Sequence, residues 1–158
     1  MESMWNEPKA MKVGLIAAVL LIVVRILLEQ IGVPVLVANI FGVVWLYFIM
    51  PAVFAVAIKN GGHNRAFGRL MKDVIFFAAY TRIMVAITYI AAHYLNWTAA
   101  RFSAAQGGTV GQEIQTLQKL LFIAGRNAII WIVMAAILGA IVGSISLIVK
   151  GKRMKAMA

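Results

Sequence analysis

The apolar stretch from Val74 to Trp97 constrains the fold of this chain most strongly, because it carries Arg82 near its middle. The stretch is long enough to cross a bilayer as a helix, since a span needs about 20 residues. An arginine inside hydrocarbon is costly unless it faces the protein interior, finds a partner or snorkels to the membrane surface. We therefore predict that this helix belongs to a bundle and turns Arg82 away from lipid.

The two faces of this predicted helix differ in character. Large, mostly apolar residues fall on one face: Phe76, Tyr80, Ile83, Ile87, Ile90 and Tyr94. Small or polar residues fall on the other: Ala78, Thr81, Arg82, Ala86, Thr88, Tyr89, Ala92 and His93. Large apolar side chains suit lipid, whereas small and polar ones suit neighbouring helices. The second face is thus expected to point into the bundle.

The composition of the chain lies outside the range of soluble proteins. Its 158 residues are 63% hydrophobic and 13% charged, and the mean hydropathy is +0.93. A soluble domain of this size would expose far too much apolar surface. We therefore predict an integral membrane protein with a single domain, residues 1–158. The absence of cysteine excludes disulfides, thiolate metal sites and iron–sulfur clusters.

Four apolar runs are long enough to span a bilayer, at about residues 11–30, 33–58, 74–97 and 128–149. They predict an all-α fold, an antiparallel four-helix transmembrane bundle. Between the third and fourth runs, Ile114, Leu117 and Leu121 form an apolar stripe. This stripe predicts a short extracytoplasmic amphipathic helix, which Gly125 is expected to end.

The net charge of +10 follows the predicted topology. Ten of the fifteen basic residues flank the spans on one side of the bundle: Lys9, Lys12, Lys59, Arg65, Arg69, Lys72, Lys150, Lys152, Arg153 and Lys155. Three lie on the other side, Arg101, Lys119 and Arg126. The positive-inside rule then places both termini in the cytoplasm, and we expect a bacterial inner membrane. Because the basic residues border the spans, anionic lipid rather than nucleic acid is the expected partner.

Two groups of these cations are candidate contacts for anionic lipid. In the first group, Arg65, Arg69 and Lys72 align at helical spacing opposite an apolar side. That pattern predicts a short interfacial helix within residues 59–73. The second group follows the fourth span: Lys150, Lys152, Arg153 and Lys155.

Small residues and a proline predict how the spans pack. Ala135, Gly139 and Gly143 recur every four residues, a spacing that lets helix backbones approach closely. This face is expected to pack against another helix, either of this chain or of a further subunit. Pro51 interrupts the second span, where it should kink the helix and free the backbone carbonyl near Tyr47.

Six polar residues of the spans are candidate ligand-binding residues: Arg82, Arg25, Glu29, Asn39, Tyr89 and His93. A helix rises about 1.5 Å per residue, so each residue can be given a depth from the cytoplasmic ends. An inner layer then surrounds Arg82. An outer layer holds the four residues Glu29, Asn39, Tyr89 and His93.

For each candidate a structural role competes with a functional one. We expect Arg82 to bind backbone carbonyls near Tyr47, freed by Pro51, and hydroxyl groups of adjacent helices, or to snorkel; the alternative is an anion site. Arg25 and Glu29 are four residues apart and should pair, although Glu29 could serve a proton or cation site. His93 is expected at the membrane interface rather than as a haem, metal or quinone ligand.

The sequence contains no catalytic triad, paired carboxylates, phosphate-binding loop or cluster with metal-ligand spacing. We therefore expect a non-enzymatic membrane protein, without metal or cofactor, that acts through helix contacts as an accessory or scaffold subunit or as a homo-oligomer. The alternative is a small transporter, channel or lipid- and anion-binding protein. A quinone-binding redox subunit is a third possibility.

Overall fold

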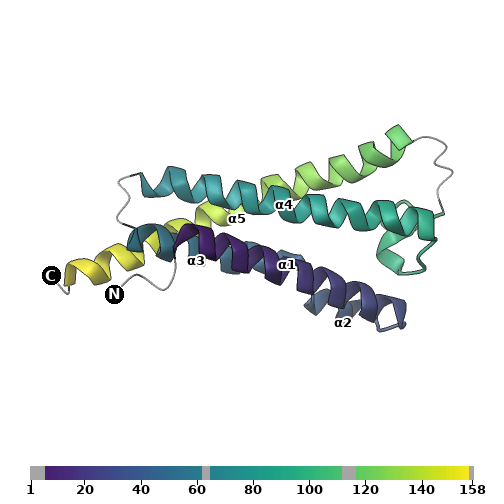
Figure 1. The fold of residues 1–158 in the computed structure, drawn as a ribbon, viewed down its shortest axis with the longest axis horizontal. Coiled ribbons are helices and arrows are strands. Elements are labelled where there is room, and N and C mark those ends of the chain that lie inside the picture. Colours follow the sequence, from purple (N-terminus) through teal and green to yellow (C-terminus); the bar gives the residue numbers. More distant parts are fainter. Residues whose placement is uncertain (1–5, 62–64, 112–116, 157–158) are drawn as a thin grey trace.

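The computed structural model describes residues 6–61, 65–111 and 117–156; for residues 117–120 and 150–156 only the backbone is described. The fold is all-α, as predicted, and four helical segments are long and apolar enough to cross a membrane. The chain is thus an integral membrane protein built as a four-helix bundle (Figure 1). The first helix begins and the last helix ends at the same end of the bundle, here called the terminal end, and residues 96–111 lie at the opposite end, here called the loop end.

The first span is a single helix, α1 (Glu7–Gln30). The side chain of Asn6 caps it by accepting a hydrogen bond from the backbone N–H of Lys9 at 3.0 Å, and Pro8 lies in its first turn. Both features are typical of helix starts. After α1 the chain reverses at Gly32, whose positive φ of 80° suits a residue without a side chain.

The second span is broken rather than continuous. It consists of α2 (Val35–Ile40), a 3-10 turn η1 (Val43–Trp45) and α3 (Leu46–Asn60). The predicted second span, residues 33–58, is present as Val35–Asn60, but it is not a single helix: the interruption lies at Phe41 and Gly42, and α3 continues through Pro51. A Cβ atom on Gly42 would lie 3.0 Å from the Asn39 carbonyl oxygen and 3.4 Å from Nη1 of Arg25, so the backbone approaches its neighbours closely there.

The third and fourth spans are longer than predicted. Helix α4 covers Ala66–Leu95, so the predicted short helix does lead into the third span, but Leu70 packs in the core and the helix is therefore not interfacial. Helix α5 covers Leu117–Ala156 without interruption. The predicted outer helix is therefore the start of α5, and Gly125 does not end it, because Gly125 lacks the positive φ of a terminating glycine. Ile114 lies outside the described residues, as does the side chain of Leu117.

The orientation of α4 follows its two-faced sequence. On one face Phe76, Tyr80, Ile83, Ile87 and Tyr94 are exposed, whereas on the other Ala78, Thr81, Arg82 and Ala92 are buried. This face packs against α3 and α5 in the core of the bundle, and α5 runs obliquely across both (Figure 1).

The small residues of α5 provide close packing within the chain itself. Ala135 is buried, and a Cβ atom on Gly139 would lie 2.5 Å from Cγ1 of Val74 on α4. A Cβ atom on Gly143 would meet Leu70 on the same helix. The α4–α5 contact in the terminal half of the bundle therefore depends on the absence of these side chains.

A leucine at position 139 should disrupt this contact. We expect Gly139→Leu to destabilise the protein by about 1–3 kcal/mol, the usual cost of overpacking, because even its Cβ atom would lie 2.5 Å from the buried side chain of Val74. Thermal unfolding in mild detergent measures the effect. Ile141→Leu, at an exposed position of the same helix, is the matched control and should be nearly silent. Equal melting temperatures for the two variants would contradict the packing described here.

Candidate functional site

A pocket of about 300 Å³ lies in the loop half of the bundle. Three arginines from separate elements line it: Arg25 on α1, Arg82 on α4 and Arg101 in the 3-10 turn η2 (Ala100–Phe102). The remaining lining residues are Ile22, Asn39, Val43, Val44, Val85, Tyr89 and Trp131. The pocket thus combines apolar walls with a high density of guanidinium groups.

Arg82 is held by a chain of hydrogen bonds through Tyr47 and Thr81. Its Nε donates to the Tyr47 hydroxyl oxygen at 2.6 Å, and that hydroxyl lies 2.9 Å from the Thr81 hydroxyl. Because arginine is only a donor, the Tyr47 hydroxyl accepts a hydrogen bond from Arg82 and donates its own proton to the Thr81 hydroxyl oxygen. The Thr81 hydroxyl in turn lies within hydrogen-bonding distance of the carbonyls of Phe77 and Ala78. All three side chains are buried, so the charge of Arg82 lies in the protein interior and the hydrogen-bond network stabilises it there.

Two aromatic rings flank the same guanidinium. Its carbon lies 5.0 Å from the ring centre of Tyr47 and 4.6 Å from that of Trp131 on α5, both within cation–π range. Of the two kinds of partner expected for Arg82, the structure shows a hydroxyl of an adjacent helix, that of Tyr47, and not the backbone carbonyl freed by Pro51. A hydroxyl reaches across the helix–helix interface, whereas a backbone carbonyl remains within its own helix.

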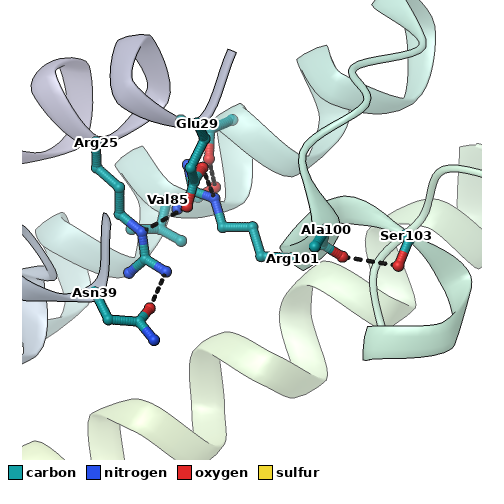
Figure 2. Close-up of polar contacts among 8 residues, drawn as sticks. Arg25, Glu29, Asn39, Val85, Ala100, Arg101 and Ser103 are labelled. Carbon is teal, nitrogen blue, oxygen red and sulfur yellow. Dashed lines mark hydrogen bonds and ion pairs between the residues drawn. The ribbon is translucent and has the colours of Figure 1, made fainter. Parts of the chain in front are cut away.

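Glu29 joins the other two arginines. Nε of Arg25 donates to Oε1 of Glu29 at 2.9 Å, as their spacing predicts, and Nε of Arg101 lies 2.7 Å from Oε2 (Figure 2). Nη2 of Arg25 donates to the side-chain oxygen of Asn39 at 2.8 Å. The carboxylate is almost fully buried, with its side chain 7% exposed. One acidic residue therefore serves two cations.

Arg101 reaches the site because residues 96–111 fold back onto the end of α4. Phe102 is fully buried, with its ring 5.1 Å from that of Tyr89 and 5.5 Å from that of Trp97. The Thr109 hydroxyl donates to the Tyr89 carbonyl at 3.1 Å, and Nδ1 of His93 lies 2.9 Å from the Thr109 carbonyl oxygen, which can only accept. These contacts fix the loop that carries Arg101.

Several donors of the three arginines have no hydrogen-bond partner among the described residues. Arg82 uses only Nε, and Nη1 of Arg25 and both terminal nitrogens of Arg101 are unpaired in that part of the chain. Burial lowers the pKa of Arg101, which lies outside the spans; the charge of Glu29 raises it and that of Arg25 lowers it. Arginine nevertheless stays protonated in proteins. The site therefore holds charged donors with unused hydrogen-bonding capacity.

The structure brings most of the predicted ligand-binding residues together. Arg25, Asn39, Arg82 and Tyr89 line one pocket, so the two predicted layers are a single site. The depth estimate considered backbone positions alone, but long arginine side chains bridge between them. His93 does not reach the pocket, because its ring is bonded to the loop.

Sequence reasoning missed Arg101, Trp131 and the polar partner Tyr47. Arg101 looked like an ordinary loop cation, and nothing local marks it as different. A usable signal was the run of aromatic residues beside it, Trp97 and Phe102, which indicates a loop that folds onto the membrane end of a helix rather than into solvent.

The predicted lipid-contacting cations lie at the terminal end. Arg65 is exposed, Nε of Arg69 pairs with Glu7 at 3.1 Å, and Nζ of Lys72 lies 5.8 Å from the ring centre of Phe76. The remaining four fall in the last turns of α5, where their side chains lie outside the described residues: Lys150, Lys152, Arg153 and Lys155. None of the first three lines the arginine pocket.

The hydrogen bond between Arg82 and Tyr47 can be tested by removing one oxygen atom. We expect Tyr47→Phe to destabilise the protein by about 1–3 kcal/mol, because a buried charged donor loses its acceptor while the ring remains. The control is Tyr80→Phe on the exposed face of α4. Thermal unfolding in detergent compares them. The assignment is wrong if the two variants melt at the same temperature.

Comparisons of the chain with protein-family models, with curated protein sequences and with solved structures found no match. Within the membrane bundle, three arginines converge on one pocket, and one carboxylate pairs with two of them.

Proposed function

We propose that this integral membrane protein binds an anion in the pocket lined by Arg25, Arg82 and Arg101. The observation that carries the proposal is the charge balance: three guanidinium groups line the pocket and one carboxylate, Glu29, pairs with two of them, which leaves a local formal charge of +2 (3 − 1). The other described carboxylates, Glu7 and Asp73, line a separate hollow at the terminal end. A net positive pocket within a low-dielectric bundle favours a negatively charged occupant.

The chemistry of the donors also supports an anionic ligand. Guanidinium groups match carboxylate and phosphate oxygens through paired N–H donors, and such charge-assisted hydrogen bonds are among the strongest in proteins. Buried donors without partners are costly, and intramembrane charges more so. Nη2 of Arg101 is such a buried donor, so an anion that accepts from it and lies beside Arg82 would satisfy this donor and balance the intramembrane charge. A purely structural arginine would be expected to use its terminal nitrogens within the protein.

The break in the second span supports the same proposal. Non-helical backbone at membrane depth is tolerated where it is buried in protein or lines a cavity. The interruption between α2 and η1 places Asn39 on one side of the pocket and Val43 and Val44 beside it. Broken helices of this kind form ligand sites in membrane transporters. The break thus has a function beyond connecting two helices.

Anion binding is better supported than assembly through the small residues of α5. Gly139 and Gly143 pack against α4 of the same chain, so the motif that suggested a subunit interface is already occupied. A role as an accessory subunit stays a prediction. We further propose, from the distribution of basic residues, that both termini face the cytoplasm of a bacterium and that the pocket lies toward the outer side of its inner membrane.

Native mass spectrometry of protein purified from membranes in neutral detergent tests the proposal. The wild type should retain an anionic ligand, and Arg101→Gln should reduce its occupancy by about tenfold or more, since a charge-assisted hydrogen bond contributes about 1.5–3 kcal/mol. Arg126→Gln is the matched control, because Arg126 is exposed on α5 and lines a different hollow.

The control variant should retain the ligand at the wild-type level. Equal ligand content in the wild type, Arg101→Gln and Arg126→Gln would show that bound anions do not depend on the pocket, and the proposal would fail. Melting temperatures measured on the same samples establish that both variants are folded.

A further inference from the structure

We infer that the anion is a phosphate monoester dianion, carried either by a lipid or by a water-soluble molecule. This inference rests on the proposed anion binding and specifies the chemical class of the ligand. It follows from three properties of the arginine pocket: its charge, the placement of its unused donors and its size.

The charge of the pocket matches two negative charges rather than one. Glu29 neutralises one of three arginines, so a carboxylate or phosphodiester would leave one positive charge uncompensated in a desolvated site. A phosphate monoester carries a charge of about −1.5 to −2 at pH 7. Because uncompensated charge in a low-dielectric site is costly, the dianion is the better complement.

The unused donors approach the pocket from three separate elements. They belong to Nη1 of Arg25 on α1, the terminal nitrogens of Arg82 on α4 and those of Arg101 in η2. A phosphate monoester has three terminal oxygens pointing in different directions, so each guanidinium can meet its own oxygen. A carboxylate offers two oxygens in one plane, and a phosphodiester has two charged oxygens. The amide oxygen of Asn39 is taken by Arg25, which leaves its N–H groups as further donors beside the pocket.

The size of the pocket suits a headgroup, and a neighbouring hollow could accept what is attached to it. A volume of about 300 Å³ holds a phosphate with a small polar group but no acyl chains. A second hollow of about 60 Å³ borders Arg82 on the α5 side, and three alanines help to line it: Ala86, Ala124 and Ala128. It shares Val85, Tyr89 and Trp131 with the main pocket. The tail of a lipid phosphate could leave along this route between α4 and α5.

Equilibrium binding of three probes to the purified full-length protein tests the inference. Isothermal titration calorimetry in neutral detergent at pH 7.5 compares dihexanoyl phosphatidic acid, a monoester, with dihexanoyl phosphatidylglycerol, a diester. Glycerol 3-phosphate is the water-soluble monoester. We expect the phosphatidic acid to bind about tenfold or more tightly than the phosphatidylglycerol, because it brings one more charge to the arginines.

A charge series sharpens the comparison. Arg101→Gln lowers the formal charge of the pocket by one and should reduce the preference for the monoester. Arg126→Gln, outside the pocket, should leave that preference unchanged. The wild-type preference is itself decisive, so the inference remains testable if Arg101→Gln fails to fold.

The pH dependence of binding provides an independent test of the ligand's charge. The second pKa of a phosphate monoester is about 6, so lowering the pH from about 7.5 to about 5.5 should reduce phosphatidic acid binding while phosphatidylglycerol keeps its single charge. The ionisable groups around the pocket are the three arginines and Glu29, together with Tyr47 on α3 and Tyr89 on α4. Protons added to these groups can only make the pocket more positive, which favours both lipids, so weaker binding of phosphatidic acid at low pH reports the charge of the ligand.

The outcomes separate the inference from the proposed function. Preference for phosphatidic acid with weak glycerol 3-phosphate binding supports a lipid monoester, whereas equally tight glycerol 3-phosphate binding supports a soluble one. Equal affinity for both lipids, lost in Arg101→Gln, would overturn the dianion inference and leave anion binding intact. Binding of all probes that is unaffected by Arg101→Gln would overturn both.

Discussion

The charge of Arg82 is the constraint on which the rest of the structure depends. A guanidinium inside a membrane bundle cannot lose its proton, so the surrounding helices must replace the water it lacks. Tyr47 on α3 and Thr81 on α4 supply a directed hydrogen-bond chain, and the ring of Trp131 on α5 lies 4.6 Å from the guanidinium carbon. One charge therefore specifies how three helices are placed around it.

The two halves of the bundle differ in how their interiors are filled. Toward the terminal end, the glycines of α5 admit Val74 and Leu70, so the contact between α4 and α5 is apolar and closely packed, and the hollow lined by Glu7 and Asp73 lies apart from that contact. Toward the loop end, the second span breaks and the interior becomes a pocket. The packed half can hold the helices in position while the open half retains polar groups whose hydrogen bonds are incomplete.

The proposed anion binding belongs to the loop half of the bundle, where the hydrogen bonds of the arginines are incomplete. Charged groups are rarely kept in a membrane for stability alone, because a well-packed apolar core costs less. Here Glu29 compensates one positive charge of three, and the loop that brings Arg101 is fixed by buried aromatic and hydrogen-bond contacts. The loop of residues 96–111 thus places the charge of Arg101 at a buried position where apolar packing alone would favour an uncharged side chain. That arrangement is consistent with a site that gains stability when an anion enters it.

The sequence by itself determined the number of spans, the inward face of the helix around Arg82 and the pairing of Arg25 with Glu29. Each follows from periodicity or from a spacing of a few residues, which local helix geometry makes reliable. The tertiary structure alone decided the break at Gly42, the continuity of α5 through Gly125 and the arrival of Arg101 beside Glu29. These depend on contacts between residues distant in the chain, which no local pattern encodes. The pocket exists because those distant contacts coincide.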